Sequence, residues 1–460
     1  MKIVVLNGSP KGDVSVTMQY VNYLIKKNPQ HEFKTLNISQ RIKAIEKNQT
    51  EFERIIADIQ EADGVLWAFP LYFLIVQAYY KRFIELVFER GARSAFVGKY
   101  AASLSTSIHF FDHTAHNYIH AICDDLGMRF VESFSPDMTD LLNEDGQTKT
   151  VQFGEHFLNA IQAHAVTMRQ YAALNWRTFQ YEPGEAKFPI ATRGKKVVIL
   201  HDSCDQASNL SRMVARCQSA FTDDITVINL HDIDIKASCQ GCLQCAANYE
   251  CAYEGKDGFI DFFRSQVMAA DILVYAGTIT DRYFSSRWKM FFDRSFFNTH
   301  TPMLSGKQVA FVISGPFGQL ENLREIFSAF IEYQKGNLAG FASDEFGSSA
   351  EIDAALDGLM ARTLTLAAQA YVQPETFLGI GGMKIFRDDI YGRLRLPFPG
   401  DHRAFQKLGF YKTFPQRDWQ NALLNLFFGP LLEIQRFRKY FTKEIKVQMV
   451  APLKKVVEKV

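Results

Sequence analysis

The sequence predicts an α/β fold with two tandem, doubly wound, parallel five-stranded sheets and a C-terminal extension. Three observations predict it. The chain has 460 residues, and domains hold roughly 150 residues each, so more than one hydrophobic core is expected. Apolar runs of strand length alternate with longer helical patterns, as in parallel sheets covered on both faces. The two halves also repeat each other.

The repeat is weak but stays in step. An apolar run leading into Gly-Ser-Pro-Lys in the first half returns as a run leading into Asp-Ser-Cys-Asp in the second. The offset grows from 194 positions between Ser9 and Ser203 to 208 positions between Lys81 and Lys289, so the second half carries an insertion, and its cysteines lie there. The matched segments are 2–7 with 195–201, 62–68 with 270–276, 81–85 with 289–293, and 99–107 with 307–315.

Each half is expected to contain five strands. They lie near 2–7, 32–38, 64–70, 99–107 and 128–135 in the first half, and near 195–201, 225–230, 271–277, 307–315 and 338–344 in the second. A helical stretch reaching Trp176 and a linker with Pro and Gly separate the halves. The predicted domains are 1–180, 195–372 and an extension over 373–460 that resembles neither repeat.

Composition narrows the class of protein. A net charge of +1 provides no basic field, which counts against a nucleic-acid partner. The N-terminus has too few apolar residues for a signal peptide, so we expect a cytoplasmic protein. Four of the seven cysteines crowd between Cys239 and Cys251, which favours a metal or redox centre over a disulfide framework.

A turn rich in hydroxyl groups follows the first strand. Ser9, Ser15 and Thr17 lie between that strand and the next helix, where backbone N–H groups and the helix dipole favour an anion. The segment matches neither G-x-x-x-x-G-K-S/T nor G-x-G-x-x-G. It therefore predicts a monophosphate site, with ordinary turn and N-cap chemistry as the alternative.

Two further loops follow strands of the same sheet. Phe69–Phe73 follows the third strand and Ser105–His109 the fourth, and their aromatic and backbone groups suit a flat polar ring. Phosphate and ring loops together predict a nucleotide-like ligand, with aromatic packing alone as the alternative. A metal site at His109, His113 and His116 is disfavoured because no carboxylate pattern supports it.

The motifs of the first half, Gly-Ser-Pro-Lys…Ser-x-Thr, Pro-Leu-Tyr-Phe and Lys-x-Phe-Ile-Glu, resemble those of the NAD(P)H-dependent FMN reductase superfamily. The resemblance implies a flavodoxin-like fold in tandem, FMN as cofactor and NAD(P)H as donor. Val16 stands where the superfamily has Asn, which removes one contact. The resemblance places the phosphate at Ser9, Lys11, Ser15 and Thr17, and the isoalloxazine ring at Pro70, Leu71, Tyr72, Phe73, Ser107, Ile108 and His109.

The cysteine cluster has its own spacing. Cys239, Cys242, Cys245 and Cys251 form C-x-x-C-x-x-C-x5-C, which predicts four ligands of one 4Fe-4S cluster. Structural zinc, a redox thiol pair and no metal are the alternatives. This spacing resembles the iron–sulfur flavoproteins of the same superfamily, and the resemblance implies electron transfer between FMN and the cluster.

The second half has a degraded phosphate loop. Asp202 and Asp205 stand in its turn, and acidic groups repel a phosphate. Arg282 or Arg287 could offset these acids, so a second FMN stays open.

The extension contains an apolar stretch at 421–434. It is followed by basic residues, Arg436, Arg438, Lys439, Lys443 and Lys446. Packing against a domain or a second chain, as in a homodimer, is favoured over contact with a membrane surface, for which the pattern is also suited.

The predicted function is an FMN-dependent oxidoreductase or electron-transfer flavoprotein. Electrons would pass between NAD(P)H or a ferredoxin-like donor, FMN and a 4Fe-4S cluster, with a small-molecule or protein redox partner. No side chain is assigned as general acid or base. The alternatives are a non-enzymatic electron carrier, a scaffold with relic sites, and an FMN reductase-like protein whose cysteines bind zinc or no metal.

Overall fold

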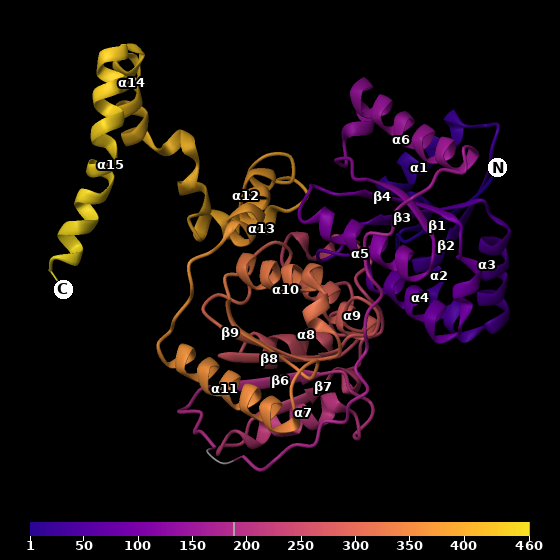
Figure 1. The fold of residues 1–460 in the computed structure, drawn as a ribbon, viewed down its shortest axis with the longest axis horizontal. Coiled ribbons are helices and arrows are strands. Elements are labelled where there is room, and N and C mark those ends of the chain that lie inside the picture. The colour runs from indigo at the N-terminus through magenta and orange to yellow at the C-terminus, as the bar shows by residue number, and fades with distance from the viewer. Residues whose placement is uncertain (187–188, 460) are drawn as a thin grey trace. The chain divides into compact units, whose positions relative to one another are not determined.

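The computed structural model describes residues 1–186 and 189–459 and contains two parallel five-stranded sheets (Figure 1). Residues 187 and 188 of the linker and residue 460 of the extension lie outside the described residues. The first sheet has the order β2-β1-β3-β4-β5 and the second the order β10-β9-β8-β6-β7. The strands of the first sheet are β1 (Lys2–Asn7), β2 (Glu32–Asn37), β3 (Gly64–Pro70), β4 (Tyr100–Thr106) and β5 (Arg129–Phe134). Those of the second are β6 (Val197–His201), β7 (Thr226–Asn229), β8 (Ile272–Thr278), β9 (Gln308–Ser314) and β10 (Asn337–Ser343).

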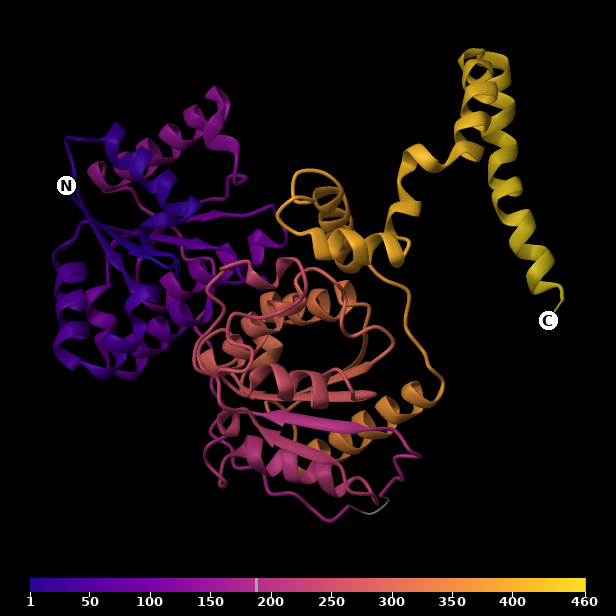
Figure 2. The same cartoon turned by 180° about the vertical axis from the view of Figure 1, so that it is seen from behind.

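Both sheets have the same topology. Read from its other edge, the second sheet runs β7-β6-β8-β9-β10, which is the doubly wound 2-1-3-4-5 order of the first. The apolar runs of β1 and β8 are buried because helices cover both faces of each sheet, as Figures 1 and 2 show. The predicted fold class is therefore confirmed.

The helices alternate with the strands along the chain. Those of the first half are α1 (Val16–Lys27), α2 (Ile38–Lys47), α3 (Gln49–Glu61), α4 (Ala78–Glu89), α5 (Asp112–Asp125) and α6 (Glu144–Gln162). Those of the second half are α7 (Asn209–Ser219), α8 (Phe259–Phe262), α9 (Ser286–Ser295), α10 (Glu321–Tyr333) and α11 (Ser349–Ala368). The cysteines lie between β7 and β8, where the first half has α2 and α3 instead.

The expected helix up to Trp176 ends earlier. α6 stops at Gln162, and His164 takes a left-handed φ of 50° that terminates it. The chain then runs without helix along α5, where Asp124 accepts hydrogen bonds from the backbone N–H of Gln170 and Tyr171 at 3.0 and 2.9 Å. The prediction was wrong because this segment lies along other elements instead of forming its own.

The two sheets are joined through a pair of matched helices, α4 and α9. Glu85 of α4 accepts a hydrogen bond from the backbone N–H of Ser286 at the start of α9, at 2.6 Å. Asp293 of α9 accepts one from the backbone N–H of Ala78 at the start of α4, at 2.7 Å. Each acid therefore caps the other helix, as expected of two repeats related by a pseudo-twofold axis.

The chain divides into two compact units, Met1–Asp401 and His402–Val460. The larger unit contains both sheets and α12 (Phe377–Tyr391), which packs against α10. α13 (Pro399–Lys407) begins at its end, so the predicted extension over 373–460 falls in both units. The smaller unit contains α14 (Trp419–Glu433) and α15 (Gln435–Val457). Among the helices of residues 1–186 and 189–459, none combines the length and apolar character that crossing a bilayer requires.

Candidate active site

A cavity of about 320 Å³ has, at one end, hydroxyl groups from the loop and helix that follow β1. Ser9, Ser15 and Thr17 line it, together with the exposed Lys11. Ser15 is the N-cap of α1 and accepts a hydrogen bond from the backbone N–H of Met18 at 3.1 Å. The four predicted phosphate residues are thus brought together at a helix N-terminus, where an anion is favoured.

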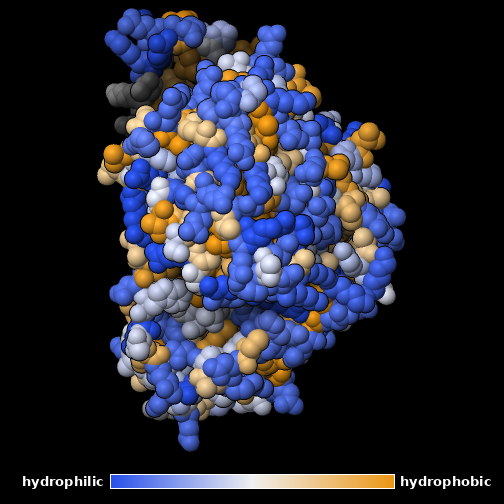
Figure 3. All heavy atoms as spheres, turned by 90° about the vertical axis from the view of Figure 1, so that its right-hand side faces the viewer, coloured by the Kyte–Doolittle hydropathy of each residue, from blue (hydrophilic) through white to orange (hydrophobic). Residues whose placement is uncertain are grey.

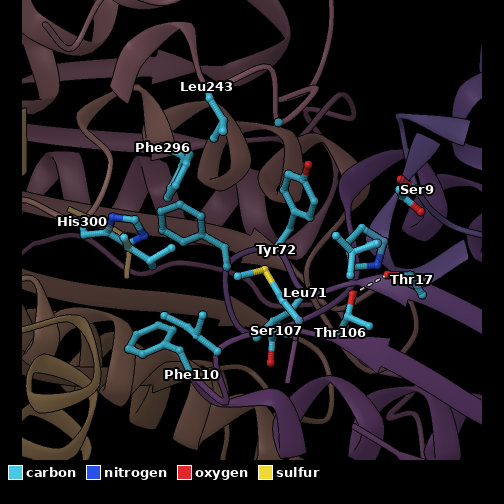
Figure 4. A pocket seen from close by; sticks show the side chains of 18 of the residues that line it. Ser9, Thr17, Leu71, Tyr72, Thr106, Ser107, Phe110, Leu243, Phe296 and His300 are labelled. Atoms are coloured by element: carbon cyan, nitrogen blue, oxygen red, sulfur yellow. Dashed lines mark hydrogen bonds between the residues drawn. The ribbon is translucent and has the colours of Figure 1, made fainter. Parts of the chain in front are cut away.

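The loops after β3 and β4 form the middle of the cavity. The lining includes Pro70–Phe73 and Thr106–Ile108, and the hydroxyls of Thr106 and Thr17 are 2.7 Å apart (Figure 4). Tyr72 and Ile75 exchange backbone hydrogen bonds across a tight turn in which Phe73 and Leu74 have φ of 41° and 63°. Such left-handed angles at two bulky residues are strained, so packing must fix this turn.

His109 alone among the predicted flavin residues does not line the cavity. Its ring is exposed and lies 2.9 Å from Asp112. Phe110, which sequence reasoning missed, lines the cavity instead. The left-handed φ of 62° at His109 turns the chain between these two side chains.

The opposite wall comes from the second half of the chain. Its lining side chains are mostly apolar and aromatic, and they would exclude water from a flat ring bound below them. In Figure 4 Phe296, Leu243 and His300 lie opposite Leu71 and Ser107, while Ser9 and Thr17 lie at the other end. The residues of this wall are Gly241, Leu243, Phe296, Thr299, His300, Tyr333, Phe386, Leu394 and Phe398.

A histidine–carboxylate pair lies in this wall. The Nδ1 atom of His300 is 2.7 Å from Oδ2 of Asp401, which is fully buried. Asp401 also accepts hydrogen bonds from the hydroxyls of Thr299 and Thr301. A carboxylate on Nδ1 fixes the tautomer and leaves Nε2 as the exchangeable position. Sequence reasoning missed the pair because its members are 101 residues apart.

The four cysteines of the predicted cluster line one small cavity. Cys239 and Cys245 are the more enclosed, and burial raises the pKa of each to about 12. None of the seven cysteines forms a disulfide within the described residues. Among residues 1–186 and 189–459, no group of three His, Cys, Asp or Glu side chains has the spacing needed to hold a metal ion. The four thiols thus line one cavity without the spacing of a preformed metal site.

The cysteine loop is fixed on both sides. Arg294 lies beneath it and donates to the carbonyl of Ala237 at 2.9 Å and to the carboxylate of Asp257 at 2.7 and 3.0 Å. From the first half, the hydroxyl of Tyr79 accepts a hydrogen bond from the backbone N–H of Ser238 at 3.1 Å. The loop therefore depends on both repeats for its position.

The two cavities share a wall. Gly241, Leu243 and Phe296 line both. Gly241 has a φ of +61°, and a Cβ atom there would lie 2.3 Å from the hydroxyl of Tyr72. Only glycine permits this close approach of the cysteine loop to the first sheet.

Family models match both halves of the chain. The model of a flavodoxin-like fold matches residues 1–164, and the model of NADPH-dependent FMN reductase matches residues 195–342. The chain is thus a tandem flavodoxin-like duplication whose second repeat matches the NADPH-dependent FMN reductase family. These family matches support an FMN-dependent oxidoreductase.

Solved structures resemble one repeat at a time, and the family models, not these structures, carry the assignment. The flavoenzyme NAD(P)H:(acceptor) oxidoreductase FerB from Paracoccus denitrificans has 19% identity and a TM-score of 0.30, covering 35% of this chain and 98% of its own. A putative quinone reductase from Klebsiella pneumoniae has 15% identity and a TM-score of 0.28, covering 38% and 89%. The general stress protein 14 of Treponema denticola, in complex with FMN, has 11% identity and a TM-score of 0.26, covering 35% and 98%. No protein of curated function matches the chain.

The second repeat of this flavin oxidoreductase has a different edge. A cavity of about 240 Å³ lies at the carboxyl ends of β8, β9 and β10, and the linker residues Trp176 and Phe179 line it. Its charged side chains are those of Asp344, Glu345 and Arg177. Because the two acids outnumber the one arginine, this edge is a poorer phosphate site than its counterpart in the first repeat.

The two arginines expected to offset the acids of the second repeat point elsewhere. Arg282 pairs with Asp125 at 2.7 Å. Arg287 donates to the carbonyls of Leu230 and Ile233. The suggestion that either would neutralise Asp202 is therefore wrong, because both are engaged in other packing.

The three clustered histidines do not converge. His116 lies buried between the hydroxyls of Ser103 and Ser105, at 2.7 and 2.9 Å, and burial lowers its pKa to about 4. His113 pairs with Glu325 at 2.8 Å. Each histidine has a separate structural partner.

Proposed function

We propose that this oxidoreductase binds one FMN in the larger cavity and one 4Fe-4S cluster at Cys239, Cys242, Cys245 and Cys251. Electrons would pass between the two centres and a NAD(P)H or ferredoxin-like donor, and onward to a small-molecule or protein acceptor. The observation that carries the proposal is the wall shared by the two cavities, formed by Gly241, Leu243 and Phe296. Two redox groups separated by one layer of residues can exchange electrons directly.

The residues of the larger cavity fit FMN. Ser9, Ser15 and Thr17 would donate hydroxyl hydrogen bonds to the phosphate, and Lys11 would supply a positive charge. Pro70–Phe73 and Thr106–Ile108 would enclose the ring, and Leu243 and Phe296 would exclude water from it. FMN supplies one- and two-electron chemistry when bound, and the cluster supplies one-electron chemistry.

His300 would hold the exchangeable proton of this site on Nε2. Its Nδ1–H group donates to Asp401, which keeps the ring oriented in the cavity wall. Phe386 and Phe398 pack against the imidazole with ring centroids 4.5 and 4.7 Å away. This packing restricts the ring to one orientation, which general acid–base catalysis requires.

Anaerobic purification tests the two centres. About one FMN and four irons per chain supports the proposal, whereas two FMN and no iron rejects it. Cys242→Ser should lose the iron and keep FMN. Cys204→Ser is the matched control, since Cys204 is an exposed free cysteine outside the cysteine cavity, and it should keep both. Zinc in place of iron would also reject the cluster.

Stopped-flow reduction separates an enzyme from an electron carrier. Rapid bleaching of the flavin by NADH or NADPH supports a reductase. Reduction by a ferredoxin-like donor alone would indicate the carrier.

A further inference from the structure

Helix α14 presents a row of exposed apolar side chains. Trp419, Leu423, Phe427 and Leu431 follow one another at four-residue spacing and so share one face of the helix. They are 64, 45, 69 and 39% exposed. Leu424, Leu426 and Phe428 widen this face and are also exposed. Water-exposed apolar surface of this extent marks an interaction site.

This apolar face contrasts with the side of the molecule that Figure 3 shows. The side of the molecule drawn in Figure 3 is mainly hydrophilic, with hydrophobic residues scattered among polar ones. In α14, by contrast, no charged residue occurs between Trp419 and Leu432. A helix this apolar is typical of a buried element or one in contact with lipid.

A basic helix follows directly. Residues 435–459 contain eight Lys or Arg and two Glu. Arg436, Lys454 and Lys455 are exposed, while the side chains of Lys443 and Lys446 lie outside the described residues. α14 and α15 lie side by side as a hairpin (Figures 1 and 2). An apolar helix paired with a basic one matches the two layers of an anionic membrane interface, acyl chains and lipid headgroups.

Length decides between lying in the interface and spanning the bilayer. α14 has 15 residues, which at a rise of about 1.5 Å each reach roughly 22 Å, short of the roughly 30 Å of a hydrocarbon core. Trp419 at its start and Arg436 just beyond its end are residue types that anchor segments at the headgroup level.

We propose that residues 419–457 bind the surface of an anionic lipid bilayer, with the apolar face of α14 inserted among the acyl chains and the basic residues of α15 at the headgroups. This proposal is independent of the flavin and cluster sites. The basic residues that follow the exposed apolar row favour an anionic lipid surface over packing against a protein.

The test uses the full chain and two kinds of vesicle, phosphatidylcholine alone and phosphatidylcholine with phosphatidylserine. We expect sedimentation with the anionic vesicles at low salt, at least about tenfold stronger than with neutral ones, and weaker binding at high salt. Leu423→Asp with Phe427→Asp should abolish it. Gln416→Asp with Gln420→Asp adds the same charge at two exposed polar positions and should retain most of it.

A second measurement does not depend on the aspartate variant, which could lose vesicle binding simply because it misfolds. Brominated lipids should quench the fluorescence of Trp419 in the unaltered chain, and Trp419→Phe should lose that quenching while still sedimenting. Three results would overturn the proposal: no binding to either vesicle, equal binding by the aspartate variant, or a dimer in solution that dissociates in that variant. The last would mean that a second copy of the chain covers this face.

Discussion

The close contact at Gly241 makes one residue a test of the shared wall. A Cβ atom there would meet the hydroxyl of Tyr72, and the φ of +61° adds backbone strain of about 1 kcal/mol. We expect Gly241→Ala to weaken FMN binding by about tenfold, because Tyr72 must move. Titration of the apoprotein with FMN, followed by quenching of flavin fluorescence, measures this.

Gly91 provides the matched control. Its φ is +64°, but no atom lies within 4 Å of a Cβ placed there. Gly91→Ala should therefore carry the strain alone and leave FMN affinity unchanged. Equal losses in both variants would show that the contact with Tyr72 has no part in binding.

Asp401 contacts the cavity wall through the imidazole of His300 and the hydroxyl of Thr299. Asp401→Asn keeps the shape of the side chain but replaces the carboxylate that faces Nδ1 of His300 with a neutral amide. We expect kcat for NAD(P)H oxidation to fall about tenfold to a hundredfold while KM and FMN affinity change less than about twofold. His113→Gln, an exposed histidine outside the cavity, should behave like the parent. A fall in FMN affinity alone would indicate a structural role.

Asp202 confers a pH dependence on the second repeat. Burial raises its pKa from 3.8 to about 6. Because the pKa of Asp202 is higher in the folded state than in the unfolded state, protonation of this carboxyl favours folding. Its contribution to the free energy of unfolding is fully present below about pH 4 and is lost as the pH rises through about 6. Asp202→Asn should be more stable than the parent at pH 7, by at most roughly 3 kcal/mol, and equal to it at pH 4. Urea unfolding at both pH values measures this, and the exposed Asp205→Asn should show no such trend.

At the scale of elements, the helix that follows the first strand of each repeat gives a matched pair. Ser15 caps α1 and Ser208 caps α7, in both cases through a hydrogen bond from a backbone N–H to the side chain. Ser15→Ala and Ser208→Ala should each lower the free energy of unfolding by about 1 kcal/mol. Only Ser15→Ala should also weaken FMN binding, by about tenfold. Weaker FMN binding in Ser208→Ala would place a flavin in the second repeat.

The strands were predictable because physics leaves few choices for their residues. A run such as Ile3-Val-Val-Leu6, fully buried, is read directly from sequence as a strand of a parallel sheet. The hydroxyls of Ser9, Ser15 and Thr17 were predictable in the same way, because the end of the first strand fixes where they lie.

Contacts between distant segments could not be predicted. His300 and Asp401 come from different parts of the chain, and no local pattern links them. His109 is exposed because its own backbone has a left-handed φ of 62°. A residue with a side chain rarely adopts this conformation, so the sequence does not predict it. Side chains from beyond the first repeat complete its cavity, and no local pattern in the sequence marks them.

At the scale of the whole molecule, the interface between the repeats resembles that of a symmetric dimer. Glu85 and Asp293 exchange equivalent contacts, as residues at an isologous interface do. Lys81 and Lys289, also equivalent in the repeat, are fully buried in ion pairs with acids of this interface. The chain thus makes, between its two repeats, contacts of the kind that two subunits make across a twofold axis.

Removing one acid should loosen this junction. Glu85 accepts hydrogen bonds from Lys81 and from the backbone N–H of Ser286, at 2.9 and 2.6 Å, and is almost fully buried. Glu85→Gln leaves Lys81 with one anionic partner in a desolvated site, so we expect a loss of roughly 3 kcal/mol in the free energy of unfolding. Glu89→Gln, on the same helix, breaks only a surface pair with Arg82 and should cost less than about 1 kcal/mol. Urea denaturation followed by circular dichroism distinguishes the Glu85→Gln and Glu89→Gln variants. Because the junction between the repeats also positions the wall shared by the two cavities, Glu85→Gln should weaken FMN binding as well. Equal losses in both variants would mean that the repeats are held together elsewhere.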